Sequence, residues 1–160
     1  MSMESNADRA VFVQLTLGRH RFALPAQIVA ELVSSSRLHT FAHTTPWVLG
    51  VLVRRGRIVP VCDVASLLIG RNIPPRRFYL IVRQQCGSIR ELLAIPVSGS
   101  CELFNADPRP SGADQPHYVT GEIAREEGEI VPVLDLDKVV AARSAMPFDE
   151  AGTAGVEAQR

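Results

Sequence analysis

The chain contains an internal repeat, and this repeat limits what the chain can fold into. Residues 58–63 read Ile-Val-Pro-Val-Cys-Asp and residues 130–135 read Ile-Val-Pro-Val-Leu-Asp, so five of six positions recur at a step of 72. A weaker repeat relates residues 22–25, Phe-Ala-Leu-Pro, to residues 93–96, Leu-Ala-Ile-Pro, at a step of 71. A repeated unit this short cannot bury its apolar face alone, so the two copies are expected to pack on each other.

Each copy has the pattern of short strands joined by turns. Residues 11–17 alternate apolar and polar side chains before a glycine, which predicts a hairpin with residues 21–24. Pro25 is expected to open a short helix over residues 26–32, because proline suits the first helical turn. Further strands are expected at residues 38–41, 47–53, 57–62, 78–83, 89–95, 100–104, 117–123 and 129–134. Short strands at regular spacing predict an all-β fold of two small barrels that share a core.

Several residues in and near the repeat are expected to have structural roles. Pro60 and Pro132 lack a backbone donor within a strand pattern, which predicts an edge or bulged position. Asp63 and Asp135 each precede a helix-like run, where an aspartate accepts hydrogen bonds from free amides and stabilises by about 1 kcal/mol. Two glycines near the turns supply backbone freedom. The expected structural set is Gly50, Gly56, Pro60, Asp63, Gly121, Pro132 and Asp135.

The overall composition is that of an ordinary globular protein. The chain has 160 residues, of which 46% are hydrophobic and 21% charged, and this length is enough for a real core. No apolar run approaches the roughly 20 residues of a membrane span, and the first ten residues lack the apolar core of a signal peptide. A cytoplasmic protein without membrane insertion is therefore expected.

One domain is expected over residues 11–142, with a first lobe at about 20–70 and a second at about 78–135. Exchange of a terminal strand or helix between the lobes is compatible with this pattern. Residues 1–10 and 144–160 are small and polar, and are expected to be disordered.

Charge is divided unevenly between the two halves. Residues 1–80 hold ten Arg against four Asp and Glu, a balance of +6, and residues 81–160 hold seven Arg and Lys against thirteen Asp and Glu, a balance of −6. The contrast is sharpest in the two repeated turns, Arg-Arg-Gly-Arg at 54–57 and Arg-Glu-Glu-Gly-Glu at 125–129. Such a dipolar chain favours head-to-tail self-association or two unlike partners. Solvated turn charges without a partner remain an open alternative.

Catalysis and metal binding find little support in the sequence. Two aspartates at equivalent places suggest an aspartic-protease dyad, but neither is followed by the Thr or Ser and Gly of such sites. No nucleophile elbow or phosphate-binding loop is present, and the cysteines and histidines lack metal-ligand spacing. The chain is therefore expected to be no enzyme and to hold no metal or cofactor.

Nucleic-acid binding is the competing function. Arg54, Arg55 and Arg57 can neutralise phosphates on the surface of a small barrel. The acidic second half and the few aromatic residues argue against nucleic acid as a partner, and protein–protein interaction is preferred.

Residues 44–68, TTPWVLGVLVRRGRIVPVCDVASLL, resemble the signature stretch of the CheW-like domain family. In that family a proline and an apolar residue precede a glycine, followed by an Arg-Gly turn and a strand ending in proline, an apolar residue and aspartate. The resemblance covers about residues 11–142. It implies two SH3-like five-stranded barrels around a common core, plus a C-terminal helix.

The same resemblance implies a function without catalysis. It implies a stand-alone adaptor that joins the cytoplasmic domain of a chemoreceptor, a methyl-accepting chemotaxis protein, to the regulatory domain of a CheA-type histidine kinase. Such an adaptor is cytoplasmic and associates with membrane chemoreceptor arrays. In this role the adaptor holds receptor and kinase so that rearrangement of the receptor biases the kinase.

The resemblance also assigns the receptor- and kinase-binding residues. Val29 and Glu31 match family positions near the receptor-facing groove, with Leu32 beside them, which implies an apolar contact and a directing carboxylate. Arg55, next to Arg54, matches the arginine of the Arg-Gly turn, where a multidentate guanidinium holds a contact. Core packing of Val29 and Leu32, and a solvated Arg55, remain open alternatives.

Two stretches depart from the family pattern. The usual Asn-Leu-Arg-Gly reads Val-Arg-Arg-Gly at residues 53–56, and the usual Val-Asp-Gly-Val reads Val-Ser-Gly-Ser at residues 97–100. These changes are expected to alter the partner surface, as in an adaptor of a surface-motility or other non-flagellar pathway.

Overall fold

The computed structural model describes residues 9–34, 37–42, 44–73, 78–86 and 88–147. Its strands are β1 (Ala10–Leu17), β2 (His20–Pro25), β3 (Val29–Ser34), β4 (Val48–Arg54), β5 (Arg57–Cys62), β6 (Phe78–Cys86), β7 (Ile89–Val97), β8 (Glu102–Ala106), β9 (Val119–Ala124) and β10 (Ile130–Leu134). The helices are α1 (Ala65–Ile69) and α2 (Leu136–Ser144), with single 3-10 turns at η2 (Ala26–Ile28) and η3 (Glu126–Gly128). The expected all-β architecture with short helices and a C-terminal helix is confirmed, although neither five-stranded sheet closes into a barrel among the described residues.

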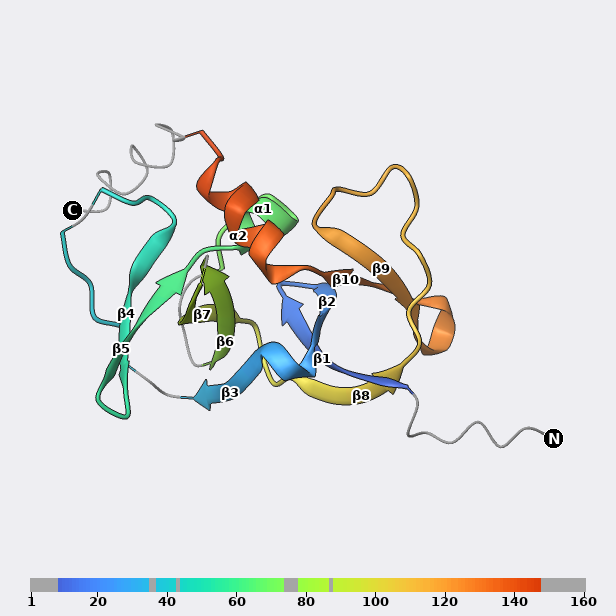
Figure 1. Cartoon of the computed structure of the whole chain (residues 1–160), viewed down its shortest axis with the longest axis horizontal. Coiled ribbons are helices and arrows are strands. Elements are labelled where there is room, and N and C mark those ends of the chain that lie inside the picture. The colour runs from blue at the N-terminus through green and yellow to red at the C-terminus, as the bar shows by residue number, and fades with distance from the viewer. Residues whose placement is uncertain (1–8, 35–36, 43, 74–77, 87, 148–160) are drawn as a thin grey trace.

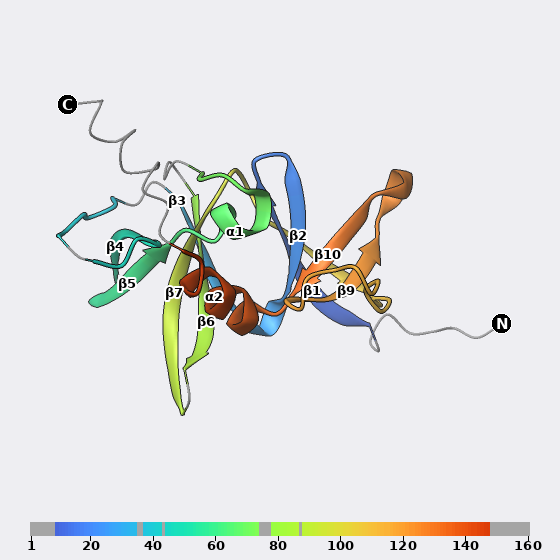
Figure 2. The ribbon, with the colours of Figure 1, turned by 90° about the horizontal axis from the view of Figure 1, so that it is seen from above.

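The strands form two five-stranded sheets that lie side by side, with α1 and α2 between them (Figures 1 and 2). Sheet A has the order β8-β1-β2-β10-β9, and sheet B has the order β3-β6-β7-β5-β4. Each sheet contains one parallel contact, Ala23 with Val133 in sheet A and Ala94 with Val61 in sheet B. These contacts correspond to each other through the repeat, so the two sheets have the same topology.

Each sheet combines strands from both copies of the repeat. Sheet A takes β1 and β2 from the first copy and β8, β9 and β10 from the second, and sheet B takes the complementary strands. The expected lobes at 20–70 and 78–135 therefore do not coincide with the sheets, because the first hairpin of each copy lies in the sheet of the other. The two strands of a hairpin pair through a local turn, but the strands that flank the hairpin in the sheet are determined by tertiary packing.

The core has three parts. The largest lies between the sheets and under both helices, and so is common to the two lobes. Each sheet also has a smaller cluster of its own, separate from the common core. The sheet B cluster includes Leu52, Val59 and Tyr79, and the sheet A cluster includes Phe12, Ile123 and Val131. Phe12 of β1 packs on the sheet A cluster, and Leu15 and Leu17 pack on the common core. Both faces of β1 are therefore covered, which explains why this strand reads as a nearly continuous buried run rather than a strict alternation.

The expected helix over residues 26–32 is wrong beyond Ile28. After the single turn η2, the chain continues as β3, which pairs with β6 from Val29 to Ser34. Three β-branched or apolar side chains gain a paired, half-buried strand there, and this tertiary gain outweighs the weak helical pattern. The expected strand at residues 38–41 reduces to one bridge between His39 and Val51.

Of the two positions expected for Pro60 and Pro132, the edge position is wrong, whereas a bulge does lie nearby: the pairing register shifts between Val61 and Cys62 and between Val133 and Leu134. Strand β5 lies between β7 and β4, and β10 lies between β2 and β9. Each strand meets its parallel neighbour at one residue pair only, one residue after the proline. The missing backbone donor therefore removes little from the sheet.

The domain extends slightly beyond residue 142, because α2 continues to Ser144 and Arg143 is buried. The expected disorder at residues 1–8 and 148–160 concerns residues outside the described part of the chain. Within that part, no helix is long and apolar enough to cross a membrane.

Candidate interaction surface

The turn between β4 and β5 is a two-residue turn formed by Arg55 and Gly56. Both residues have positive φ, 51° and 75°, and Arg54 pairs directly with Arg57 across the hairpin. Positive φ at both central positions defines a type I′ turn, whose twist matches that of the flanking strands. Glycine adopts this conformation without strain, whereas Arg55 is one of only two non-glycine residues with positive φ in the described chain.

This hairpin register separates apolar from charged side chains. Val53 lies opposite Ile58, and both are largely exposed, at 60% and 72%. Because side chains alternate along a strand, Arg54 lies on the opposite face, the one that also carries the buried Leu52. The tip therefore presents an apolar pair on its outer face and an arginine on its inner face.

Glu31 of β3 receives that arginine. The Arg54 Nε atom donates to Glu31 Oε1 at 3.0 Å and Nη2 donates to Oε2 at 3.1 Å, while Arg55 Nη2 lies 4.0 Å from Oε2. Two parallel hydrogen bonds of this kind are the strong form of an arginine–carboxylate pair. The hydrogen bonds from Arg54 lower the pKa of Glu31, and the charges of Arg54 and Arg55 add to the effect. Glu31 is therefore held within the protein.

A bulge in β3 decides which residues face which side. Val29 pairs with Val82 and Glu31 with Ile81, so the register shifts between them. Val29 consequently packs on the common core, whereas Glu31 lies on the face of the sheet B cluster. Arg83 holds this corner, because its Nη1 donates to the carbonyl oxygens of residues 27 and 29, each at 3.2 Å.

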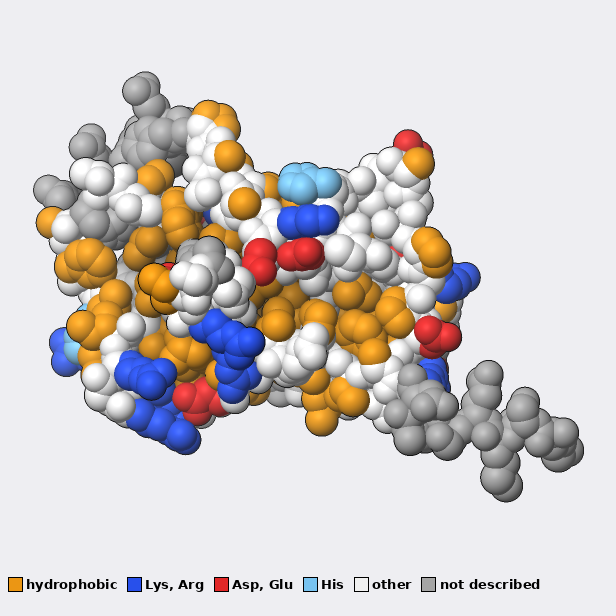
Figure 3. All heavy atoms as spheres, in the orientation of Figure 1, with side chains coloured by type: hydrophobic (Ala, Val, Ile, Leu, Met, Phe, Trp, Pro, Cys, Tyr) orange, Lys and Arg blue, Asp and Glu red, His pale blue; other side chains and the backbone are white. Residues whose placement is uncertain are grey.

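The predicted binding residues thus fall on two faces of the first lobe. Glu31, Arg54 and Arg55 come together in one ion-paired cluster, and Arg and Lys side chains gather around a carboxylate near β3 and the β4–β5 turn (Figure 3). Val29 and Leu32 lie on the other face of β3, where Val29 is half-buried and Leu32 is exposed. Val29 therefore packs on the core, as the structural alternative expected, and Leu32 keeps an exposed side chain.

The second lobe contains an equivalent ion pair that the sequence reasoning missed. Arg125 Nη2 lies 2.8 Å from Glu102 Oε1, and these residues follow Arg54 and Glu31 at a step of 71. The Arg125 guanidinium also lies over the Phe104 ring, 4.1 Å from its centre, a cation–π contact. The sequence could have indicated this pair, because the step of 71 residues that relates residues 22–25 to residues 93–96 also relates Glu31 to Glu102 and Arg54 to Arg125.

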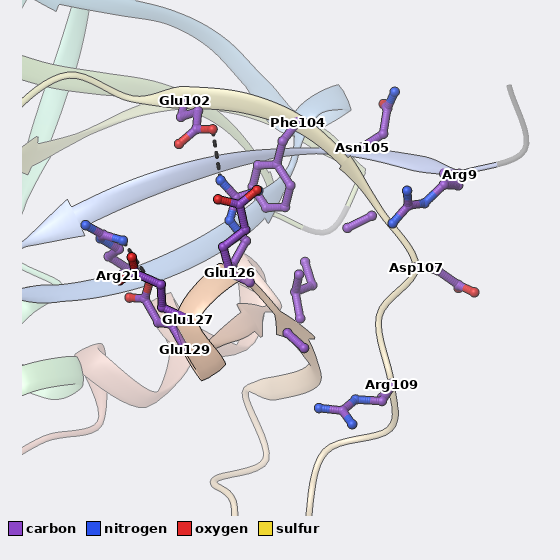
Figure 4. Close-up of a pocket in the computed structure, with 14 residues that line it drawn as sticks. Arg9, Arg21, Glu102, Phe104, Asn105, Asp107, Arg109, Glu126, Glu127 and Glu129 are labelled. Carbon is purple, nitrogen blue, oxygen red and sulfur yellow. Dashed lines mark hydrogen bonds and ion pairs between the residues drawn. The ribbon is translucent and has the colours of Figure 1, made fainter. Parts of the chain in front are cut away.

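An open cleft of about 690 Å³ lies at the rim of sheet A, where it is lined by residues of both repeat copies (Figure 4). Arg21 and Glu129 form an ion pair of 2.7 Å across it, and Glu126 and Glu127 line it from the turn after β9. This turn has one more residue than its counterpart in the first lobe and is acidic where the other is basic. The two turns have opposite charge, whereas the cleft itself is mixed: five Asp and Glu side chains line it together with Arg9, Arg21, Arg109 and Arg125.

The two repeat-equivalent aspartates differ in their surroundings. Asp63 Oδ1 accepts from the Ser66 amide at 3.1 Å, and Asp135 Oδ1 accepts from the Lys138 amide at 3.2 Å. Only Asp63 is also bound by Arg143, whose Nε donates to the Asp63 carbonyl oxygen at 2.8 Å and whose Nη2 lies 3.4 Å from Oδ2. Both side chains of this pair are buried, so Asp63 joins the C-terminal helix to α1.

Gly50 and Gly121, which also correspond through the repeat, lie beneath loop segments. A Cβ added to Gly50, whose φ is 154°, would lie 2.5 Å from the His39 carbonyl oxygen. At Gly121 the closest approach would be 3.1 Å, to the Arg109 carbonyl oxygen. The absence of a side chain therefore lets each loop lie directly on the strand.

The arginines of the basic turn differ in their contacts. Glu31 holds Arg54 through two hydrogen bonds, whereas Arg55 lies 4.0 Å from Glu31 with its side chain 80% exposed, and Arg57 makes no ion pair with the described residues. The described residues also contain no group of three His, Cys, Asp or Glu side chains able to hold a metal ion.

Known proteins resemble this chain in fold and in sequence pattern. The structure is similar to the scaffolding protein TtCheW from Thermoanaerobacter tengcongensis, with a TM-score of 0.70 and 16% sequence identity over 87% of this chain and 92% of that chain. No curated protein sequence matches the chain significantly. The family model of the CheW-like domain matches residues 11–144. The chain belongs to the CheW-like domain family.

Proposed function

We propose that this chain is a non-catalytic adaptor in bacterial chemosensory signal transduction. It would couple the cytoplasmic domain of a methyl-accepting chemotaxis receptor to the regulatory domain of a CheA-type histidine kinase. The observation that carries the proposal is family membership across residues 11–144. The fold likeness to a protein described as a scaffold supports it.

The first lobe offers two surfaces of different chemistry for such partners. The Leu32 side of β3, beside the half-buried Val29, suits the apolar tip of a receptor hairpin. The outer face of the β4–β5 tip, with Val53 and Ile58 exposed above the basic turn, suits a kinase domain with an apolar patch and acidic rim. Arg55 is well exposed and can contact either partner.

The opposite charge of the two repeated turns supports head-to-tail self-association as well. The basic turn at 54–57 on one molecule is complementary to the acidic turn that carries Glu126 and Glu127 on another. A contact driven by these charges weakens as salt screens them, so crosslinking between copies should fall between low and high ionic strength. Crosslinking that is independent of salt would count against this contact.

The location proposed for this adaptor is the cytoplasm, at membrane-associated receptor arrays. The proposed partners do not include nucleic acid, because the second half of the chain is acidic and Glu31 holds Arg54 through two hydrogen bonds. Salt-dependent binding to duplex or single-stranded nucleic acid, with no binding to a receptor, would favour the rival function.

The decisive experiment measures binding of the purified chain to a receptor cytoplasmic fragment and to the kinase regulatory domain from the same genome. Binding of both at moderate salt is expected, and binding of neither refutes the proposed function. Arg55→Glu tests the surface, with Arg19→Glu as a control on a different turn. Unchanged coupling in a folded Arg55→Glu protein would remove Arg55 from the site.

A further inference from the structure

The β6–β7 hairpin is longer than its counterpart in the first copy of the repeat. Phe12 pairs with Pro25 in the β1–β2 hairpin, and Tyr79 pairs with Pro96 in the β6–β7 hairpin. The two prolines are related by the repeat step of 71, whereas Tyr79 follows Phe12 by only 67 residues, so the second hairpin contains four additional residues. These four form two further cross-strand pairs, Gln85 with Arg90 and Cys86 with Ile89.

The additional pairs extend past the neighbouring strand of sheet B. The pairing of β3 with β6 reaches Val82, and beyond this residue β6 pairs only with β7 among the described residues. Figure 2 shows the hairpin projecting past the rest of sheet B beside α2. There the amide of Gln85 donates to Asp137 Oδ1 at 3.1 Å, which joins the extension to the first turn of α2. A two-stranded hairpin is only marginally stable by itself, so this contact helps to fix the extension.

A cavity of about 500 Å³ lies between the extension, the start of α2 and the end of β2. Its floor is apolar and consists of Pro25, Ile28, Leu134 and Leu136. Both leucines are buried residues of the common core, and Ile28 packs against that core. Ligand pockets usually have volumes of roughly 300–1,000 Å³ and combine apolar surface with a few polar groups. The cavity therefore has the size and the floor of a ligand site.

Charges of opposite sign border this floor on two sides. Arg83 and Arg90 lie on the hairpin, and Asp135 and Asp137 lie at the start of α2. In the view of Figure 3, basic side chains gather near β6 and acidic side chains near the start of α2, with hydrophobic side chains exposed between them. None of the four charged side chains forms an ion pair with the described residues. Arg83 is already bound to two backbone carbonyl oxygens, so Arg90 is the guanidinium that is left for a ligand.

We propose that this cavity binds a short peptide with free ends and apolar side chains. The terminal carboxylate contacts Arg90, the terminal ammonium group contacts Asp137, and the apolar side chains lie on the floor between them. Carboxylates form strong, directional hydrogen bonds with guanidinium groups, and a ligand that complements the charges of both walls is preferred over singly charged ones.

A peptide fits this site better than a single amino acid. The two charged walls belong to different elements, the hairpin and α2, with the apolar floor between them. An amino acid carries both of its backbone charges on one carbon atom, whereas a short peptide holds them apart. The site also lies away from the surfaces proposed for receptor and kinase, so the proposal does not depend on the adaptor function.

Calorimetric titration of the whole chain with the dipeptide Leu-Leu tests this proposal. We expect a dissociation constant below about 1 mM. Two control ligands each lack one part of the recognised chemistry: Gly-Gly has no apolar side chains, and acetyl-Leu-Leu-amide has no charged ends. Each should bind at least about tenfold more weakly. Absence of detectable Leu-Leu binding, or equal binding of the three ligands, overturns the proposal.

Variants of the two walls assign each end of the peptide. Arg90→Gln removes the guanidinium, and Asp137→Asn removes the negative charge but keeps the Oδ1 atom that accepts from Gln85. Arg90→Gln should weaken acetyl-Leu-Leu about tenfold and leave Leu-Leu-amide unchanged, and Asp137→Asn should do the reverse. Arg19→Gln, in the turn of the shorter β1–β2 hairpin, is the matched control and should change neither affinity. The proposal is overturned if Arg90→Gln affects both ligands equally, or if Arg19→Gln has as large an effect.

Shortening the hairpin separates this site from the proposed adaptor function. Deletion of residues 85, 86, 89 and 90 gives the β6–β7 hairpin the length of its counterpart and removes one wall of the cavity. The shortened protein should lose Leu-Leu binding and keep its affinity for a receptor fragment and a kinase regulatory domain. Unchanged Leu-Leu binding overturns the proposal, whereas failure of the natural protein to bind receptor and kinase counts against the adaptor function only. Thermal melting checks that each variant is folded, and the point variants decide the outcome if the shortened protein does not fold.

Discussion

Replacement of Arg143 by methionine should destabilise the domain strongly. Arg143→Met keeps most of the aliphatic volume but leaves the Asp63 carbonyl oxygen and Oδ2 without the guanidinium that lies 2.8 and 3.4 Å away. The Asp63 side chain is only 4% exposed and that of Arg143 11%, so water does not readily replace the lost donor. Breaking a buried ion pair by removing one partner costs about 3–5 kcal/mol. Because Ser66 still donates to Asp63, the loss should lie near the lower end, about 3 kcal/mol.

Urea unfolding, followed by circular dichroism, measures this loss as a change in the free energy of unfolding. For a chain of this size about 3 kcal/mol corresponds to a fall in melting temperature of about 6–12 °C. Asp135→Ala is the matched control, because Asp135 caps the equivalent helix without a buried arginine, and it should cost about 1 kcal/mol. A loss below about 1 kcal/mol in Arg143→Met, or an equal loss in both variants, would refute the reasoning.

Three other predictions follow from the same structure. Gly50→Ala should lower the free energy of unfolding by about 2–4 kcal/mol, because the added Cβ would lie 2.5 Å from a carbonyl oxygen at a residue with a φ of 154°. Gly121→Ala should lower it clearly less, and equal losses in denaturant unfolding would contradict this. Hydrogen bonds from Arg54 lower the pKa of Glu31, so Glu31 contributes stability above its unfolded pKa that disappears as pH falls through the lowered folded pKa. The difference in unfolding free energy between the natural protein and Glu31→Gln should therefore shrink in acid. A constant difference across a pH series would contradict this. Burial raises the pKa of Cys62 to about 12, so native alkylation followed by mass spectrometry should find it unmodified at pH 8 and modified only after unfolding.

Much of the fold could be predicted from the sequence because its signals are local or repeated. The hairpin of residues 11–17 with 21–24, the strands of the second copy and the C-terminal helix follow from alternation, turn residues and capping aspartates. The recurring segment at 58–63 and 130–135 indicated two similar units, and its two strands occupy equivalent central places, β5 and β10, in the two sheets. Periodicity reports contacts between near neighbours, and these elements depend mainly on such contacts.

The errors arose where distant neighbours decide the structure. Residues 29–32 have a weak helical pattern, but pairing with β6 makes them a strand with a bulge. Pro60 was expected at an edge or a bulge, and β5 is flanked on both sides because the first hairpin of each copy joins the sheet of the other. Neither outcome is visible in a local window, since each depends on a strand that lies many residues away.

The candidate site shows the same division. The family resemblance singled out Val29, Glu31, Leu32, Arg54 and Arg55, and the structure adds which of them touch. Glu31 was expected as a directing carboxylate, and the structure adds that it accepts two hydrogen bonds from Arg54. The equivalent pair of Glu102 and Arg125 was missed, although the repeat step pointed to it.

By itself, the sequence determined a duplicated all-β domain of the CheW-like type, with a basic turn in one copy and an acidic turn in the other. These properties are written in residue order, because hairpin turns, strand alternation and charge depend on residues close together in the chain. Only the tertiary structure decided that the copies exchange hairpins, that Asp63 anchors the last helix through Arg143, and that Glu31 faces Arg54 rather than solvent. The two ion pairs join residues 23 and 80 positions apart, and the exchanged hairpins join residues 33 and 110 positions apart. Such pairings are set by shared burial and by the relative placement of strands, which no local pattern records.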